Sequence, residues 1–172
     1  VVVPPFRGCV EAGIFPGMPA HNEYSGIPGH GNKALLDDVL RKEGGFEGFV
    51  VSDWMDVERM QDYHRVGETL QDVYKLTLDA GLDMHMHGPD FYWELLDMHK
   101  SGILSEQRID ASVNKLLEAT FRLGLFDEPF ITEDKLPAVL FTVDHRASAL
   151  ACRRQSHVLL TSAQILPLAA QT

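Results

Sequence analysis

The chain has 172 residues, of which 45% are apolar, and its 25 acidic and 15 basic side chains give a formal charge of -10. This length can bury the core of about one ordinary domain. The acidic balance argues against a nucleic-acid partner, because such proteins concentrate Lys and Arg to displace the counterions of the phosphate backbone. The sequence has no run of about eighteen apolar residues, so it predicts no membrane-spanning segment.

Short apolar runs alternate with helical patterns along the chain, which is typical of parallel βαβ units rather than of a bundle or a sandwich. The predicted strands are 17–20, 48–52 and 82–86. The predicted helices are 32–43, 67–79, 90–100, 105–123 and 144–155. The strongest strand candidate is 48–52, because a β-branched and aromatic run after a glycine-rich turn is typical of a strand buried on both faces.

The ends of two predicted helices carry sequence signals. Asn32 is a plausible N-cap of the first helix, and Gly44 and Gly45 are placed to end it in left-handed geometry. Gly124 supplies the stop of the longest helix. After residue 126 the pattern changes, so we expect a linker with a helix over 127–157 and the opening strand of a further domain in 158–172.

Three βα units are too few to close a parallel barrel, which needs about eight strands and roughly 250 residues. The sequence therefore predicts either an open sheet or part of a barrel.

Asp53 is the main candidate for a catalytic residue, because it directly follows the predicted strand 48–52. Polar side chains at the carboxyl ends of parallel strands face the ligand cleft. A carboxylate there can attack or stabilise an oxocarbenium-like centre, and the indole of Trp54 offers a flat apolar face to a sugar ring. An equally acceptable interpretation is that Asp53 caps the following helix.

The sequence resembles glycoside hydrolase family 3, the β-glucosidase family, over nearly its whole length. The similar segments are 18–33 (MPAHNEYSGIPGHGNK), 35–36, 39–43, 45–46, 48–54 (GFVVSDW), 80–84, 109–110, 121–126, 158–160 and 165–168. Their order and spacing are those of the family, which makes the set far more specific than any single motif.

The resemblance implies a retaining β-glycosidase without a cofactor. The expected fold is α/β: residues 1–126 resemble the C-terminal part of a TIM-like (β/α)8 barrel with about three βα units, and 158–172 the start of an α/β sandwich. Asp53 matches the nucleophile, and Trp54, His21 and Met18 match substrate-binding positions. Where this chain has His21, the family often has Tyr, which leaves the stacking and hydrogen-bonding role open there.

The resemblance leaves the general acid/base unassigned, because the family supplies it from the second domain, and we expect it to lie outside this chain. Retention needs two carboxyl groups about 5–5.5 Å apart. Glu23 and Asp56 are near in sequence, but we interpret them as loop or first-turn residues. Glu106, Arg108 and Asp110 have the pattern of a solvated first turn.

Other chemically notable residues have plainer interpretations. Cys9 and Cys152 show no disulfide or metal spacing, and we expect isolated buried thiols. The His85-x-His87 pair has acceptable metal-ligand spacing, but no further ligand completes a shell, so the sequence predicts a cleft-facing pair and no metal site. His30 lacks the context of a phosphate loop. The aromatic run 91–93 is expected to form a packed helix face.

Two rival functions stay open. One is a catalytically inert fragment or assembly module that associates with other chains through open sheet edges. The other is a small α/β enzyme unrelated to sugars, for which the sequence lacks a nucleotide or phosphate signature. The expected partner is a β-glucoside or a related carbohydrate. The start of the chain, VVVPP, lacks the features of a signal peptide, and the sequence assigns no compartment.

Overall fold

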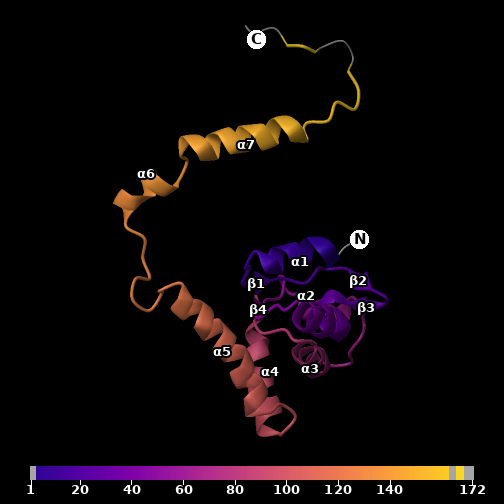
Figure 1. Cartoon of the computed structure of the whole chain (residues 1–172). Helices are drawn as coiled ribbons and strands as arrows, with labels where there is room; N and C mark the ends of the chain where they lie inside the picture. Colours follow the sequence, from indigo (N-terminus) through magenta and orange to yellow (C-terminus); the bar gives the residue numbers. More distant parts are fainter. Residues whose placement is uncertain (1–2, 163–165, 169–172) are drawn as a thin grey trace. The chain divides into compact units, whose positions relative to one another are not determined.

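The protein is described by a computed structural model over residues 3–162 and 166–168, and it divides into two compact units, Val1–Phe126 and Asp127–Thr172. The elements of the first unit are α1 (Val3–Glu11), β1 (Pro16–Gly17), β2 (Glu23–Tyr24), β3 (Ile27–Pro28), η1 (Gly29–Gly31), η2 (Ala34–Glu43), β4 (Phe49–Val50), α2 (Asp56–Asp62), α3 (Leu70–Ala80), α4 (Pro89–Lys100) and α5 (Glu106–Arg122). Those of the second are η3 (Glu133–Lys135), α6 (Leu136–Val139) and α7 (Val143–Ser156) (Figure 1).

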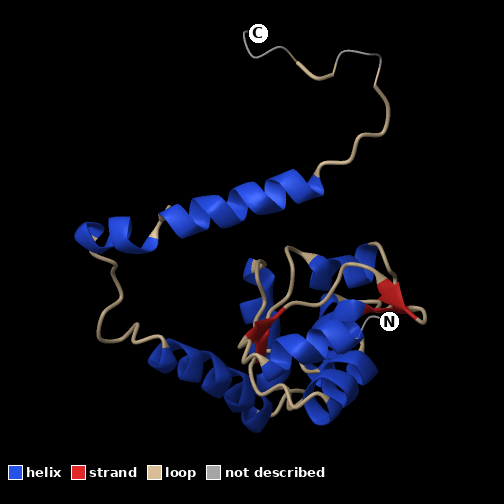
Figure 2. Ribbon diagram, turned by 45° about the horizontal axis from the view of Figure 1, so that its top comes forward, coloured by secondary structure: helices blue, strands red, loops and turns tan. Residues whose placement is uncertain are grey.

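Three strand segments lie in parallel order in the first unit. β1 pairs with β4, and Val51 forms a single parallel bridge with Met84. These segments correspond to the predicted strands 17–20, 48–52 and 82–86, but they are much shorter than predicted. The prediction is wrong for 18–20, and it is confirmed for 82–86 only at the bridge. Figure 2 shows the separate antiparallel pair of β2 and β3 away from these strands.

The predicted helices of the first unit are confirmed within a few residues. Thr69 and Asp72 form a reciprocal capping box at the start of α3, and the Ser105 side chain caps α5. The segment predicted as helix 32–43 is the π-helix η2, whose last turn includes the bond from Gly44 N to Val39 O. The side chain of Asn32 accepts a hydrogen bond from the Leu35 backbone, as expected of a cap.

Several short elements were not predicted. They are α1, the β2–β3 hairpin, η1, η3 and α6, whereas α2 was expected only as a helix after Asp53, without bounds. The start of α2 is unusual, because Met55 at its N-cap has φ 55° and offers no side-chain hydrogen bond. A methionine in left-handed geometry is not a helix-start signal, which is why the sequence pattern does not locate the start of this helix.

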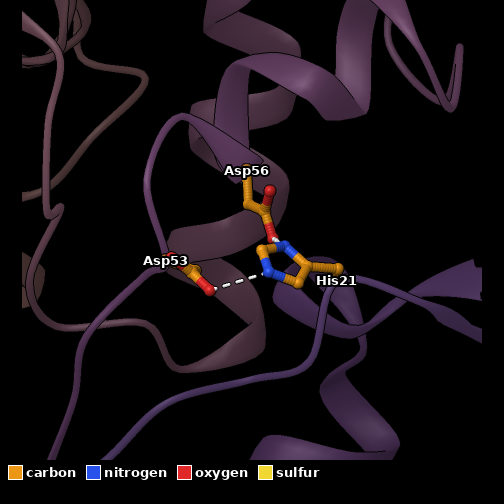
Figure 3. Close-up of side chains that lie close together, drawn as sticks. All are labelled: His21, Asp53 and Asp56. Carbon is orange, nitrogen blue, oxygen red and sulfur yellow. Dashed lines mark hydrogen bonds and ion pairs between the residues drawn. The ribbon is translucent and has the colours of Figure 1, made fainter.

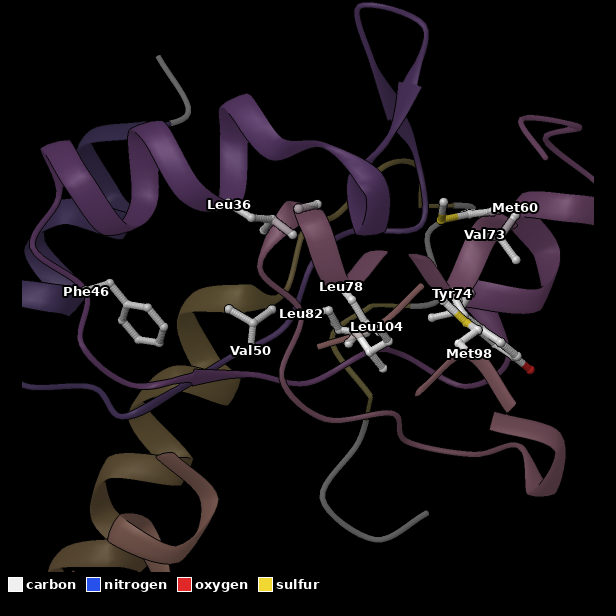
Figure 4. Close-up of a cluster of buried hydrophobic side chains, with 12 residues drawn as sticks. Leu36, Phe46, Val50, Met60, Val73, Tyr74, Leu78, Leu82, Met98 and Leu104 are labelled. Atoms are coloured by element: carbon white, nitrogen blue, oxygen red, sulfur yellow. The ribbon is translucent and has the colours of Figure 1, made fainter. Parts of the chain in front are cut away.

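The core of the first unit lies where η2, β4, α2, α3 and α4 meet (Figure 4). Its buried apolar side chains are Leu36, Phe46, Val50, Val57, Met60, Val73, Tyr74, Leu78, Ala80, Leu82, Met98 and Leu104. Val57 and Met60 of α2 pack in this core, and Ser52 beside β4 is fully buried. Burial of the residues on both sides of Asp53 therefore anchors the loop that carries it.

A buried ionic network joins β4 to the neighbouring helices. The Asp83 carboxylate accepts hydrogen bonds from Arg41, Lys115, Ser112 and the backbone N–H of Val50. Arg108 donates to the carbonyl oxygens of Leu78 and Leu82 and to the hydroxyl of Ser112. The prediction that Arg108 belongs to a solvated first turn is therefore wrong, because its guanidinium satisfies carbonyl groups at the end of α3.

The second unit has no buried residue in α6 or α7. α7 confirms the predicted helix 144–155, and Thr142 caps its start. The opening strand predicted within 158–172 is not formed over the described residues 158–162 and 166–168. Residues 163–165 and 169–172 of this segment lie outside the described residues. Among the described residues, no helix has both the length and the apolar character needed to cross a membrane.

Both cysteines are free and exposed, so the prediction of buried thiols is wrong. Cys9 lies in α1 and Cys152 in α7, and both helices lack buried residues. The reason is the exposure of these two helices, which the spacing of the cysteines in the sequence does not reveal.

Candidate active site

The backbone around Asp53 is fixed on three sides. Ser52 donates its N–H to the carbonyl of Met84, and its hydroxyl accepts a bond from the N–H of Met86. The N–H of Asp53 donates to Nε2 of His30 at 3.0 Å. These contacts hold Asp53 at the carboxyl end of β4 with its carboxylate 29% exposed, so a solute can reach it.

The imidazole of His21 lies between two carboxylates (Figure 3). Its Nε2 is 2.9 Å from Oδ2 of Asp53, and its Nδ1 is 2.5 Å from Oδ2 of Asp56. An ionised carboxylate only accepts hydrogen bonds, so both ring nitrogens of His21 carry hydrogen when both carboxylates are ionised. The histidine side chain is 63% exposed, whereas that of Asp56 is 5% exposed. His21 thus connects a solvent-facing carboxylate to a buried one.

Asp56 is held from two further directions. Its Oδ1 accepts a hydrogen bond from Arg59 at 3.0 Å, and its Oδ2 lies 3.6 Å from Nδ1 of the buried His30. Burial lowers the pKa of His30, and the negative charges of Asp56 and Asp53 offset only part of this effect. A neutral His30 suits its position, because Nε2 must accept the hydrogen bond from the backbone of Asp53 while Nδ1 carries the hydrogen that faces Asp56.

A second histidine contact fixes the loop after Met84, which lies beside the loop that carries Asp53. His85 is buried, and its Nε2 lies 3.0 Å from Oε1 of Glu58, which also accepts a hydrogen bond from the Tyr74 hydroxyl. Burial of Glu58 would raise the pKa of its carboxyl group, but hydrogen bonds from His85, its own backbone and Tyr74 lower it overall. Burial and the Glu58 contact raise the pKa of Tyr74. The ring of His85 also stacks on Phe91.

Trp54 lies beside Asp53 and stacks on His87, with ring centroids 3.8 Å apart and an interplanar angle of 9°. Trp54 as a residue is 52% exposed, so a ligand can reach it. Its backbone N–H donates to Oδ1 of Asp53 at 2.6 Å. Asp53 therefore has one carboxylate oxygen turned to its own chain and the other to His21.

A cavity of about 310 Å³ opens beside His21 and Asp56, and Asp53 does not line it. It is lined by His21, Asp56, Arg59, Tyr63 and His64. His64 forms a separate ion pair with Glu23 at 2.7 Å, and this pair does not contact Asp53. Glu23 is therefore paired with a residue of the cavity wall and does not itself line the cavity.

The structure brings together most of the residues that the sequence singled out. Asp53, Trp54 and His21 lie within one set of contacts, whereas Met18 is half-exposed and takes no part in them. The alternative that Asp53 caps the following helix is wrong, because its carboxylate bonds the N–H of Trp54 and α2 starts from Met55 without a side-chain cap.

Asp56, His30 and Glu58 are the members of the site that the sequence did not assign to it. Asp56 is a first-turn residue, as predicted, but it is also buried against His21. No local pattern reveals this contact, because the two residues lie 35 positions apart. Glu58 directly follows Asp56 and Val57, and its contacts with His85 and Tyr74 join residues 27 and 16 positions away, so no local pattern reveals its role either.

Two further predictions about aromatic and histidine residues need correction. His85 and His87 do not form a cleft-facing pair, because the side chain of His85 is buried against Glu58 and only His87 is exposed. In the run 91–93, Phe91 packs against the core, but Tyr92 and Trp93 are 62% and 61% exposed. The packed-face prediction is therefore right for Phe91 alone.

Residues 1–119 match the family model described as "Glycosyl hydrolase family 3 N terminal domain". A β-xylosidase of Formosa agariphila is 37% identical over 179 residues, which cover 98% of this chain and 24% of that protein. A lysosomal β-glucosidase of Dictyostelium discoideum is 32% identical over 156 residues, or 87% of this chain and 19% of the relative. The chain thus spans about a quarter or less of the length of these relatives.

Solved structures agree with these relatives. A β-glucosidase from Erythrobacter marinus superposes with a TM-score of 0.82 at 35% identity, covering 98% of this chain and 22% of that one. A β-glucosidase from Listeria innocua, solved in complex with glucose, gives a TM-score of 0.81 at 33% identity, covering 97% of this chain and 23% of that one.

Proposed function

The chain belongs to glycoside hydrolase family 3, and from this premise we propose that it carries the nucleophile side of a retaining β-glycosidase active site, with Asp53 as the nucleophile. The observation that carries the proposal is the placement of Asp53. Its backbone is fixed by His30, and its solvent-facing carboxylate is oriented by His21 at 2.9 Å. A nucleophile held in one orientation needs little reorganisation to attack.

In the proposed first step, a carboxylate oxygen of Asp53 attacks the anomeric carbon while the bond to the leaving-group oxygen breaks. The product is a glycosyl ester of Asp53, and the leaving group takes a proton from a general acid. Water then attacks the same carbon, loses a proton to the base, and releases Asp53 as a carboxylate. His21 supports the proposal because its Nε2 lies 2.9 Å from Oδ2 of Asp53 and so orients the carboxylate.

Asp56 is unsuited to be the general acid. Its Oδ1 accepts a hydrogen bond from Arg59 and its Oδ2 contacts His21, so both oxygens are engaged within the chain, and the side chain is buried. We therefore give Asp56 an orienting role toward His21 and assign the acid/base to no described residue. Its expected position outside this chain stays a prediction.

The proposed substrates are carbohydrates with a terminal β-linked sugar, of the β-glucoside or β-xyloside type. The names of the relatives and the glucose complex of the Listeria innocua enzyme support this class. Trp54 is proposed to present its free face to a sugar or leaving-group ring, since His87 covers the other face. Met18 keeps its predicted substrate-binding role as a prediction, and so does self-association through open strand edges.

The proposed organisation assigns residues 1–126 to about three βα units of a TIM-like barrel. The parallel order of β1, β4 and the bridge at Met84 supports it, with helices between consecutive strand segments. Residues 127–157 would then be the linker with its helix, and 158–172 the start of an α/β sandwich.

The test uses a substrate whose leaving group needs no general acid. We expect 2,4-dinitrophenyl 2-deoxy-2-fluoro-β-glucoside, or its xyloside counterpart, to leave a covalent 2-fluoroglycosyl group on the peptide that contains Asp53. Mass spectrometry of the digested 172-residue chain detects this adduct. The fluorine slows the hydrolysis of the ester, which is the second step, so the adduct accumulates.

The matched variants are Asp53→Asn and Asp38→Asn, the latter an exposed carboxylate paired with Lys42. Asp53→Asn should abolish the adduct and should lower any turnover of aryl β-glycosides by several orders of magnitude, because it removes the covalent step. Asp38→Asn should behave as the unmodified chain. An adduct on a different residue, or none with either sugar, contradicts the assignment of Asp53.

A further inference from the structure

We propose that His21 and Asp53 bind a divalent transition-metal ion, Zn²⁺ above all, and that Asp56 orients His21. The bound ion prevents Asp53 from acting as a nucleophile. The donor atoms of the three side chains lie within 4.8 Å of one another. They come from three segments: the loop before β2, the loop after β4 and the first turn of α2.

The donor distances are close to those that a metal ion requires. Zinc binds imidazole nitrogen and carboxylate oxygen at about 2.0–2.2 Å, so two donors on one tetrahedral ion lie about 3.4 Å apart. Nε2 of His21 and Oδ2 of Asp53 are separated by 2.9 Å. The two side chains need to open by only about half an ångström, and the exposed ring of His21 is free to make this movement.

The other nitrogen of His21 already has the partner that a metal-bound histidine usually has. Metal-ligating histidines nearly always donate their second N–H to a carboxylate, a carbonyl or water. Nδ1 of His21 makes this contact with Oδ2 of Asp56, which is itself fixed by Arg59 and lies close to His30. The imidazole is therefore oriented before any ion arrives, with Nε2 directed toward the carboxylate of Asp53.

The binding step balances as an exchange of a proton for the ion. The bond between Nε2 of His21 and its hydrogen breaks, a bond from Nε2 to the metal forms, and the proton passes to solvent. Asp53 supplies the second protein ligand, and water fills the remaining positions. A nitrogen and oxygen donor set favours Zn²⁺ and Cu²⁺ over Mg²⁺ and Ca²⁺, which take oxygen ligands.

The consequence for catalysis rests on the proposed function. A carboxylate oxygen shared with a dication is a poor nucleophile, and the ion occupies the space in front of Asp53 that the anomeric carbon must enter. Zinc should therefore compete with the substrate. Binding of the ion itself depends only on the geometry of the three side chains.

The experiment measures Zn²⁺ binding by isothermal titration calorimetry to the 172-residue chain with Cys9→Ser and Cys152→Ser, which remove the two exposed thiols as competing ligands. We expect one site that His21→Phe and Asp53→Asn each weaken by at least tenfold. Asp56→Asn should weaken binding by about 10–100-fold, as is typical for the outer partner of a ligand histidine. Circular dichroism of each variant confirms that it is folded.

The matched control is His64→Phe, which removes a histidine paired with one carboxylate in the same cavity. This variant should bind Zn²⁺ as the parent does. Zinc affinity that is unchanged in His21→Phe, or lost in His64→Phe instead, overturns the proposal, and so does an absence of binding at millimolar zinc.

A second measurement separates this proposal from the assignment of Asp53 as nucleophile. Zinc should suppress the 2-fluoroglycosyl adduct in the parent, and His21→Phe should relieve the suppression in whatever adduct that variant still forms. An adduct without zinc binding overturns the metal site and leaves the proposed function intact. Zinc binding without any adduct supports the metal site and contradicts the assignment of Asp53 as the nucleophile.

Discussion

Asp83 is the residue whose replacement should destabilise the first unit most clearly without touching the candidate site. Its side chain is 1% exposed and lies 2.5 Å from Arg41 and 3.1 Å from Lys115. It also accepts from the N–H of Val50 at 2.9 Å and from Ser112 at 3.1 Å. The variant Asp83→Asn keeps the size of the side chain but removes its charge.

The expected loss follows from the cations that remain. Removal of one partner of a buried ion pair costs about 3–5 kcal/mol, because the other charge stays buried without compensation. Arg41 and Lys115 are 14% and 27% exposed, so solvent screens them in part and the lower end, about 3 kcal/mol, applies. Burial already lowers the pKa values of Lys115 and Arg108, and the charge of Asp83 offsets only part of this effect.

A loss of about 3 kcal/mol is a large share of the roughly 5–15 kcal/mol that stabilises a typical domain. For a chain of this size it corresponds to a fall in Tm of roughly 6–12 °C. Urea and thermal unfolding followed by circular dichroism measure both quantities. The control is Glu118→Gln, which breaks an exposed pair with Arg122 and should cost at most about 0.5 kcal/mol. A loss below about 1 kcal/mol for Asp83→Asn would refute the reasoning.

Two further predictions concern stability. Burial raises the pKa of Glu58, but the hydrogen bonds from His85, its own backbone and Tyr74 outweigh this effect, so the folded pKa lies below the unfolded value of 4.5. The ionised form therefore stabilises the fold above pH 4.5, and this contribution is lost as the pH falls through the folded pKa. Glu58→Gln should therefore be less stable than the parent at neutral pH, and urea titrations should show that the difference in free energy of unfolding becomes smaller in acid. A difference that does not change with pH would contradict this prediction. Gly48→Ala should fail to fold, because its Cβ would lie 1.7 Å from the carbonyl oxygen of Phe15, whereas Gly8→Ala meets nothing within 4 Å and should leave thermal unfolding unchanged. A stable Gly48→Ala protein would contradict this packing.

The helices were predictable because their signals are local. The apolar spacing and capping residues of α3 and α5 lie within each segment, so the sequence places both helices within a few residues. The strands were less predictable. An apolar run such as 48–52 shows that a segment is buried, but the length of its pairing depends on partner segments elsewhere in the chain.

The sequence by itself determined the position of Asp53 at the end of a buried strand, the presence of Trp54 beside it, and the family to which the chain belongs. These features rest on adjacent residues and on motifs in a fixed order. Only the tertiary structure decided that His21 lies between Asp53 and Asp56, and that Asp83 gathers cations from η2 and α5. Such contacts join residues about 30 or more positions apart, and packing of the core fixes their distances, which no local pattern of residues encodes.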